Sequence, residues 1–329
     1  MKFNAIRLDQ EGGKRVSRMV EQTVADLDPG EVVIKSRYAA VNYKDARAVT
    51  GVGNVVSRFP CVPGVEVAGT VVESSDPAFK PGDVVTVQGG REFGMRRDGA
   101  YSEYVRVPAA WIGRVPEGSD GFDMVGMGLA AYTSALAVDE LMRRVRPDRG
   151  PILVTGGTGG SSSFAISMLA GLGYRVVAST GKAASEAQYL RKIGAADIIG
   201  RGDIAGGDKP LEEQRWAGGI DAVGGAPLDA LLRSTQQHGV VCAFGNAAGE
   251  ELKTSVYPFI LRSVSLVGIN GNHPVPQRGD VWARMMAGGD LHPKHIADIC
   301  YTIPFAGLQA HCDKLIAGGV RGRAVVTFG

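Results

Sequence analysis

The residues with the clearest chemical meaning lie in a glycine-rich turn near the middle of the chain. Residues 152–180 read ILVTGGTGGSSSFAISMLAGLGYRVVAST, the pattern of a strand, a tight turn, a helix and a second strand. Glycines let such a turn bend sharply and let its backbone N–H groups approach a phosphate. At the start of a helix, those N–H groups and the helix dipole favour an anion. The stretch therefore predicts that the turn binds the pyrophosphate of a nucleotide.

The glycine fingerprint of dinucleotide folds, G-x-G-x-x-G, falls here on Gly157, Gly159 and Ser162. The third glycine ordinarily lets the helix pack closely on the strand. A serine adds one Cβ and one hydroxyl, so we expect slightly relaxed packing and an intact phosphate cradle. A turn without a ligand is the alternative, but the strand before it and the helix after it favour nucleotide binding. The expected binding residues are Thr155, Gly157, Thr158, Gly159, Gly160, Ser161 and Ser162.

The ends of the next two strands indicate which nucleotide is bound. An NAD site usually carries Asp or Glu at the end of the second strand, where the carboxylate binds the ribose hydroxyls. No carboxylate stands there in this chain. Two hydroxyls and two cations suit the 2′-phosphate of NADPH instead, although Lys182 and Arg201 also read as ordinary surface charges. The expected residues at this end are Ser179, Thr180, Gly181, Lys182 and Arg201.

The elements that must position these residues change in character along the chain. Residues 1–123 contain β-branched runs between turn signals, which predict an irregular barrel. Residues 124–270 alternate short apolar strands with helical patterns, one of them LEEQRW at 211–216. This alternation predicts βαβ units and a parallel sheet with helices on both faces. Residues 271–329 hold two helical patterns and a last strand, which we expect to return to the first domain. The predicted fold class is α/β.

Composition and charge limit the classes of function. A chain of 329 residues suggests two domains, and a net charge of +2 provides no electrostatic footprint for nucleic acid. No apolar run is long enough for a membrane span, and charge appears too early in MKFNAIRLDQ for a signal peptide. We expect a cytoplasmic protein whose thiols are reduced and scattered in the core. Its cysteines are Cys61, Cys242, Cys300 and Cys312.

Five stretches together resemble the medium-chain dehydrogenase/reductase superfamily over nearly the full length of the chain. They are AAVNYKDARAVTG, FPCVPGVEVAGTVVES, FKPGDVV, GAYSEYVRV and ILVTGGTGGSSS. The resemblance implies a GroES-like β-barrel domain made of residues 1–123 and 271–329. It also implies a Rossmann NADPH-binding domain, a doubly wound parallel sheet, over residues 124–270.

The zinc site of the alcohol dehydrogenases in this superfamily is missing from the sequence. Those enzymes carry GHE after the proline-glycine turn and a cysteine upstream, whereas PGVE places Val65 at the histidine position and VNYKD has no cysteine. The remaining thiols and imidazoles do not have the spacing of a zinc site. His292 and His295 have no third ligand nearby in sequence. We therefore predict that the protein binds no metal.

The zinc-free relatives that the chain resembles are quinone and enoyl reductases, above all the acrylyl-CoA reductase group. VVASTGKA, QRWAGGIDAVGG and YPFILRSVSLVGIN carry this likeness. It implies an NADPH-dependent reductase that transfers a hydride to the C=C bond of an α,β-unsaturated carbonyl, such as a short enoyl-CoA. An NADPH quinone or enone reductase and a non-catalytic NADPH-binding protein are the alternatives. Arg96 and Arg97 are candidates for a CoA phosphate, with a solvated loop as the other interpretation.

The motif VNYKD at 41–45 supplies the candidate catalytic residues. Hydride transfer needs the two carbons held in reach and a hydrogen-bond donor for the developing enolate oxygen. The resemblance places Tyr43 beside the nicotinamide, as a possible donor, and a core aromatic is the alternative. Asn42 and Asp45 are candidates for orienting the site, with turn formation as the alternative. Lys44 reads as a surface cation.

Later strands contribute further candidates. Gly245 and Asn246 end a predicted strand, where open α/β sheets form their ligand crevice. Ile260 is expected to line the cofactor cleft or to pack in the core. Gly271 is included as a cofactor residue, and it stands where we associate a serine with the acrylyl-CoA reductase group. Relatives of this kind pair through the edge of the Rossmann sheet, which implies a homodimer through SVSLVGI at 263–269.

Overall fold

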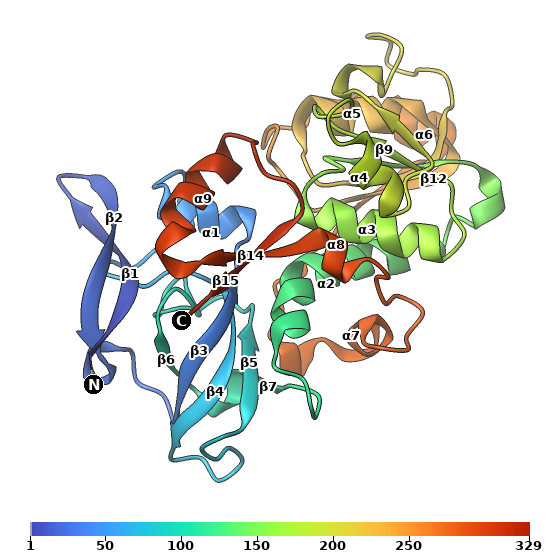
Figure 1. The fold of residues 1–329 in the computed structure, drawn as a ribbon. Helices are drawn as coiled ribbons and strands as arrows, with labels where there is room; N and C mark the ends of the chain where they lie inside the picture. Colours follow the sequence, from blue (N-terminus) through green and yellow to red (C-terminus); the bar gives the residue numbers. More distant parts are fainter. Residues whose placement is uncertain (1) are drawn as a thin grey trace. The chain divides into compact units, whose positions relative to one another are not determined.

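A computed structural model describes residues 2–329, and they form two compact units (Figure 1). The first unit holds the residues up to Leu129 together with Asn272–Gly279 and Cys300–Gly329. The second unit holds Ala130–Gly271 and Asp280–Ile299. The segment Asp280–Ile299 thus groups with the second unit, whereas the sequence assigns the whole tail to the first domain.

Side-chain contacts explain why that segment belongs to the second unit. The backbone N–H of Lys294 donates to Ser167 Oγ over 3.1 Å, and Lys192 Nζ lies 2.5 Å from Asp298 Oδ1. No periodicity in the sequence reveals contacts of this kind, because they join segments more than 100 positions apart. The functional domain boundaries given above stay a prediction.

The first unit is built on a seven-stranded sheet in the order β14-β15-β3-β4-β5-β7, with β6 also paired to β3. β15 pairs antiparallel with β3, so the last strand of the chain joins the sheet of the first unit. All pairs are antiparallel except β14 with β15. The strands are β3 (Val32–Ala40), β4 (Glu66–Ser74), β5 (Val84–Gln88), β6 (Tyr104–Val107), β7 (Ile112–Arg114), β14 (Cys300–Pro304) and β15 (Arg323–Thr327). The α-helices are α1 (Tyr43–Val49) and α9 (Leu308–Ile316).

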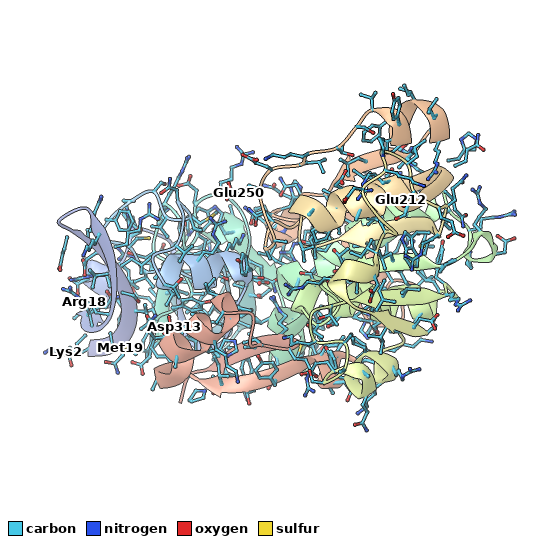
Figure 2. All side chains as sticks on the ribbon, turned by 90° about the horizontal axis from the view of Figure 1, so that it is seen from above. Lys2, Arg18, Met19, Glu212, Glu250 and Asp313 are labelled. Carbon is cyan, nitrogen blue, oxygen red and sulfur yellow. The ribbon has the colours of Figure 1, made fainter. Side chains whose placement is uncertain are left out.

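A separate hairpin of β1 (Lys2–Glu11) and β2 (Lys14–Thr23) begins the first unit. Figure 2 marks Lys2, Arg18 and Met19 on it. The hairpin is tied to the rest of the unit where the Leu8 N–H donates to the carbonyl of Cys61 over 2.9 Å. The core below the sheet consists of β-branched and aromatic side chains that alternate with polar ones along the strands. Its members include Val32, Ile34, Val67, Val85, Phe93, Tyr101 and Val326.

The second unit contains a six-stranded parallel sheet in the order β10-β9-β8-β11-β12-β13. Numbered by their position in the chain, these strands follow the Rossmann order 3-2-1-4-5-6. The predicted α/β class is therefore confirmed. The strands are β8 (Ile152–Thr155), β9 (Val176–Ser179), β10 (Asp197–Ile199), β11 (Trp216–Asp221), β12 (Thr235–Ala243) and β13 (Ser265–Gly268). The helices are α3 (Gly160–Gly171), α4 (Ala187–Lys192), α5 (Gly225–Ser234), α6 (Tyr257–Arg262), α7 (Gly279–Met285) and α8 (Ile296–Ile299).

One sequence prediction for the second unit is wrong, because LEEQRW forms no helix. Residues 211–215 are irregular, and Trp216 begins β11. The segment is held by partners distant in sequence: Glu212 pairs with Arg233 over 3.1 Å, and its carbonyl accepts from Arg262 Nη2 over 2.5 Å. Tertiary bonds thus override the local helix propensity. Single 3₁₀ turns complete the secondary structure at Val24–Asp26, Ala109–Trp111, Pro147–Arg149, Arg201–Asp203, Val275–Gln277 and Phe305–Gly307.

The chain passes from the first unit to the second within α2 (Phe122–Met142). Gly128 breaks this helix with φ 42° and ψ −140°, a conformation that side chains disfavour. Because the helix is broken at Gly128, the N–H of Leu129 is available and donates to Glu66 Oε1 over 2.6 Å.

None of the helices in residues 2–329 has the length and hydropathy of a membrane span. The four cysteines are buried and free, as predicted.

Candidate functional site

The glycine-rich turn joins β8 to α3 at the carboxyl edge of the parallel sheet. Gly156 adopts φ 60°, and the N–H of Gly159 donates to its carbonyl over 2.8 Å, which closes the turn. A side chain at Gly157 would start 3.0 Å from the Cβ of Ala178 on β9. The tight bend therefore requires Gly156, and Gly157 favours close packing on β9. Helix α3 begins at Gly160 with the N–H groups of its first turn at this edge, as an anion site needs.

Ser162 is a structural part of the turn. Its side chain is buried, and its hydroxyl donates to the carbonyl of Thr155 over 2.8 Å. The neighbouring Ser163 hydroxyl donates to the Gly157 carbonyl over 3.2 Å and accepts from Tyr189. The added hydroxyl at the third fingerprint position thus has a partner at the end of β8. It points back to the strand and leaves the helix N-terminus open.

Thr155 and Asp221 connect β8 to β11, the two strands between which the strand order reverses. Thr155 Oγ1 donates to Asp221 Oδ1 over 2.7 Å and accepts from the Ala222 N–H over 3.1 Å. Asp221 Oδ2 accepts from the Gly224 N–H over 2.7 Å. Burial raises the pKa of Asp221, and these hydrogen bonds oppose the rise. The sequence did not single out Asp221, although it ends a buried strand at the point where such sheets bind ligands.

The expected 2′-phosphate residues come together at the ends of β9 and β10. A side chain at Gly181 would start 3.0 Å from Arg201 Nε, so the guanidinium lies against this glycine. Within residues 2–329 no hydrogen bond or ion pair engages Arg201, which is exposed. The backbone N–H of Lys182 donates to Thr180 Oγ1 over 3.2 Å, and Thr158 Oγ1 lies 3.2 Å from the same oxygen. The hydroxyl of Ser179 donates to the carbonyl of Gly200.

The other cofactor candidates have different environments. Gly245 packs so tightly on the backbone of Ala222 that any side chain there would overlap it, and Asn246 is exposed. A Cβ at Gly271 would overlap Thr133 Oγ1, so a side chain there would require Thr133 to move. Ile260 lies on α6 and is 66% exposed, so it does not pack in the core of the chain.

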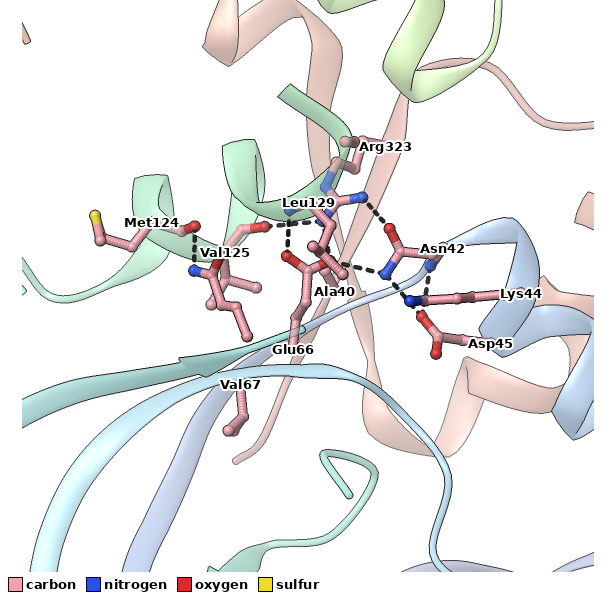
Figure 3. Close-up of polar contacts among 12 residues, drawn as sticks. Ala40, Asn42, Lys44, Asp45, Glu66, Val67, Met124, Val125, Leu129 and Arg323 are labelled. Atoms are coloured by element: carbon pink, nitrogen blue, oxygen red, sulfur yellow. Dashed lines mark hydrogen bonds and ion pairs between the residues drawn. The ribbon is translucent and has the colours of Figure 1, made fainter. Parts of the chain in front are cut away.

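Asn42 forms the centre of a polar network in the first unit (Figure 3). Its amide nitrogen donates to Asp45 Oδ2 over 2.8 Å and to Glu66 Oε2 over 2.7 Å, and its oxygen accepts from Arg323 Nη1 over 2.9 Å. The amide is therefore engaged by protein partners on every side. Asn42 also precedes the first residue of α1, where Asp45 accepts its backbone N–H. Through these contacts, Asn42 holds the VNYKD segment in position.

A buried ion pair anchors this network. Arg323 Nη2 lies 2.5 Å from Glu66 Oε2, and both side chains are almost fully buried. The same nitrogen donates to the carbonyl of Val125 over 3.2 Å (Figure 3). Neither residue is predicted from the sequence as a site residue, and the two stand 257 positions apart. Glu66 was visible as a carboxylate inside the apolar run VEVAG, a pattern that signals a buried partner.

Tyr43 and Lys44 begin α1 beside this network. Tyr43 is 37% exposed, so it is not a core aromatic of the chain. Lys44 is not the surface cation that the sequence suggests. It is partly buried, and its Nζ donates to Asn272 Oδ1 over 2.9 Å. Asn272 in turn donates to the carbonyl of Gly90 over 2.7 Å.

Burial dominates the titration of this segment. It lowers the pKa of Lys44, while the charges of Asp45 and Glu66 act in the opposite direction. It raises the pKa of Asp45 to about 6, although Lys44 and the bonds from Asn42 oppose the rise. Ionisable groups with such shifts mark candidate functional sites.

The remaining candidates are engaged locally. The Arg97 guanidinium stacks over the Trp111 ring at 5.1 Å and donates to the Pro29 carbonyl, while Arg96 lies 3.8 Å from Glu92 at the surface. Both arginines thus have partners in or near their own loop.

Among residues 2–329 no three His, Cys, Asp or Glu side chains come together as a metal site. Val65 is fully buried.

Comparisons with known proteins agree with this architecture. Residues 28–117 match the alcohol dehydrogenase GroES-like domain, and residues 160–287 match the zinc-binding dehydrogenase family. The chain is 40% identical over 328 residues to the putative quinone oxidoreductase YhfP of Bacillus subtilis, covering 98% of each chain. It is 39% identical over 329 residues to the acrylyl-CoA reductase AcuI of Ruegeria pomeroyi, again covering 98% of each chain.

Solved structures show the same fold over the whole chain. The yhdH oxidoreductase of Salmonella enterica in complex with NADP has a TM-score of 0.90 at 35% identity, with 100% of both chains covered. The Bacillus subtilis protein yhfP with NAD bound has a TM-score of 0.90 at 36% identity, also with 100% of both chains covered. This chain therefore belongs to the quinone oxidoreductase and acrylyl-CoA reductase group of the medium-chain dehydrogenase/reductase superfamily.

Proposed function

We propose that the protein is an NADPH-dependent reductase of α,β-unsaturated carbonyl compounds, with a short enoyl-CoA such as acrylyl-CoA as its substrate. The observation that carries this proposal is the 39% identity to an acrylyl-CoA reductase over 98% of both chains. That match spans both compact units, so it covers the nucleotide turn and the VNYKD segment together. The Rossmann strand order supports a dinucleotide at the carboxyl edge of the second unit.

NADPH rather than NADH is proposed as the reductant because of the groups at the ends of β9 and β10. Residues 179–182 contain no carboxylate to bind ribose hydroxyls, and Arg201 lies exposed against Gly181. Relatives are known with either nucleotide, since yhdH holds NADP and yhfP holds NAD. The positive charge at this edge supports the phosphorylated form.

The chain's own residues have separable tasks in this reaction. NADPH supplies the hydride, and the turn at 155–162 with the start of α3 holds the pyrophosphate. Lys182 and Arg201 are proposed to bind the 2′-phosphate, while Gly245 and Gly271 keep backbone close where a side chain would not fit. Asn42 positions the VNYKD segment, and Tyr43, which is 37% exposed, is proposed to donate a hydrogen bond to the substrate. No metal is part of the proposal, since a buried valine fills position 65.

A quinone or enone reductase is the second candidate, and the 40% identity to a putative quinone oxidoreductase favours it specifically. Loss of NADPH absorbance with acryloyl-CoA, with a small enone and with a 1,4-quinone separates the two. Turnover of acryloyl-CoA with a kcat/KM well above that of the quinone supports the first proposal. Quinone turnover alone would replace it with the second. Binding of NADPH without turnover of any acceptor would indicate a non-catalytic protein.

The proposal includes a cytoplasmic homodimer. β13 is the edge strand of the sheet, with one side unpaired among the described residues. The adjoining helix α6 and the residue before it expose four large apolar side chains: Val256, Tyr257, Ile260 and Leu261. An unpaired edge beside an exposed apolar patch is typical of a protein–protein interface.

A further inference from the structure

Lys44 has no role in the proposed binding of NADPH or transfer of the hydride. It occupies the second position of α1, between the exposed Tyr43 and the buried Asp45. Its ammonium makes one hydrogen bond, to Asn272, and no ion pair with residues 2–329. An ammonium has three N–H donors. Two of them therefore stay available on a side chain that the protein has partly withdrawn from water.

Charges of both signs surround Lys44. Asp45 of α1 and Glu66 of β4 attract the ammonium, whereas Arg323 of β15 and Arg278 repel it. Each of these groups has a partner of its own. Glu66 pairs with Arg323, Asp45 accepts from Asn42, and Arg278 donates to Gln88 Oε1 over 2.9 Å. Desolvation is therefore the largest influence on the Lys44 ammonium. It lowers the pKa of Lys44, so the ammonium is a stronger acid.

The proposed reduction needs such an acid. Hydride addition to the β-carbon leaves an enolate, and a proton must reach its α-carbon to complete the product. Tyr43 of the same motif is already proposed as the hydrogen-bond donor to the carbonyl oxygen, and Asn42 and Asp45 are less suited to the task. The Asn42 amide is engaged by three partners, and the Asp45 carboxyl is buried and already bonded. General acids work best when their pKa approaches the working pH.

We propose that the Lys44 ammonium is the proton donor to the α-carbon of the enolate. This assignment rests on the proposed function. The hydride forms a C–H bond at the β-carbon, and the π electrons of the C=C bond move into the enolate. A Lys44 N–H bond then breaks as the α-carbon C–H bond forms, and NADPH ends as NADP⁺. The neutral amine regains its proton from water. Asn272 positions the nitrogen through its side-chain oxygen.

Lys44→Met tests the proposal, because methionine keeps the length of the side chain and removes the proton. Steady-state kinetics with NADPH and acryloyl-CoA across the pH range is the measurement. We expect kcat to fall by about a hundredfold or more and the decline of kcat at alkaline pH to disappear. Lys44→Arg keeps the positive charge, but a guanidinium does not give up its proton in a protein, so this variant should be as slow as Lys44→Met. Lys35→Met, at an exposed lysine of β3, is the matched control and should behave as the wild type.

Asn272→Asp gives an independent test that keeps the lysine. A carboxylate in place of the amide oxygen favours the charged ammonium, so the alkaline decline of kcat should move to higher pH. A purely structural role for Lys44 would leave the position of this decline unchanged. Circular dichroism and NADPH affinity of each variant show whether it is folded.

Three results would overturn the assignment. Lys44→Met with the kcat and alkaline decline of Lys35→Met would exclude Lys44 as the donor. A raised KM for acryloyl-CoA with kcat and pH profile intact would make Lys44 a substrate-binding residue. An unmoved alkaline decline in Asn272→Asp would assign that decline to another group. The failure of the proposed function is a different result, namely a wild-type protein that turns over no activated alkene.

Discussion

At the scale of single residues, Ser162 illustrates how a departure from a motif is accommodated. Its hydroxyl donates to the Thr155 carbonyl inside the turn, so its role is to stabilise the strand end. Ser162→Ala should lower the free energy of unfolding by about 0.5–1.5 kcal/mol, the usual value of one such bond. The Kd of NADPH should change little. Urea unfolding and fluorescence titration measure the two quantities. Weaker NADPH binding at unchanged stability would show that the hydroxyl contacts the phosphate instead.

Arg201 is the residue on which cofactor choice depends most. The Arg201 side chain is exposed, lies against Gly181 and has no partner in residues 2–329, which is expected of an arginine that binds an anionic group of the cofactor. Arg201→Ala should raise the KM for NADPH by about tenfold to a hundredfold, which corresponds to one charge-assisted hydrogen bond. The KM for NADH should not change. Arg146→Ala, at an arginine whose side chain is 80% exposed, is the control. An equal loss with both nucleotides would contradict a 2′-phosphate site.

At the scale of elements, the break in α2 determines the geometry of the buried network. Gly128 has a positive φ, and a Cβ there would overlap Glu66 Oε1. Gly128→Ala should therefore lower the free energy of unfolding by at least about 1–3 kcal/mol, the strain of such a backbone. Gly202→Ala is the control, since Gly202 has open space and no positive φ. Thermal unfolding compares the two, and equal melting temperatures would show that α2 adjusts without strain.

Helix α6 and strand β13 carry the prediction of oligomeric state. Ile260→Glu places a charge in the exposed apolar patch, and a buried charge without a partner is strongly unfavourable in an interface. We expect the wild type to sediment as a dimer and this variant as a monomer. Met19→Glu, on the hairpin of the first unit, is the matched control because Met19 is also an exposed apolar side chain. A monomeric wild type, or an unaffected variant, would remove this face as the interface.

At the scale of the whole molecule, local patterns predicted the elements better than the contacts among them. The strand, turn and helix around residues 152–171 follow from short-range periodicity and glycine spacing, and the structure confirms them. The ion pair of Glu66 with Arg323 joins residues 257 positions apart, which no local pattern encodes. The hydrogen bond of Lys44 likewise joins it to Asn272, which stands 228 positions away. Pairings across long sequence separations therefore account for most of what the sequence analysis missed.

The stability of the protein should depend on pH because the pKa values of Asp45 and Asp290 are shifted in the native state. Burial raises the pKa of Asp45 to about 6, above the value of about 4 in an unfolded chain. The native state therefore binds more protons between those values, so the free energy of unfolding falls as pH rises from about 4 to about 6. Asp290 affects the free energy of unfolding in the opposite direction, because Arg284 lowers the pKa of this carboxyl. The stability that Asp290 contributes is present above about pH 4 and is lost as the solution becomes more acidic.

Asp45 should consequently contribute more to stability near pH 5 than near pH 7. Asp45→Asn removes the titrating carboxyl and keeps an oxygen that accepts the Asn42 N–H, so its stability should vary less over this range. The expected difference in slope corresponds to about 2–3 kcal/mol between pH 4 and pH 6. Urea unfolding at a series of pH values measures it, with Asp290→Asn as the control that changes only the acid limb. Parallel curves for the wild type and Asp45→Asn would mean that Asp45 stays ionised in the native protein and that the network around Asn42 is stabilised by charge.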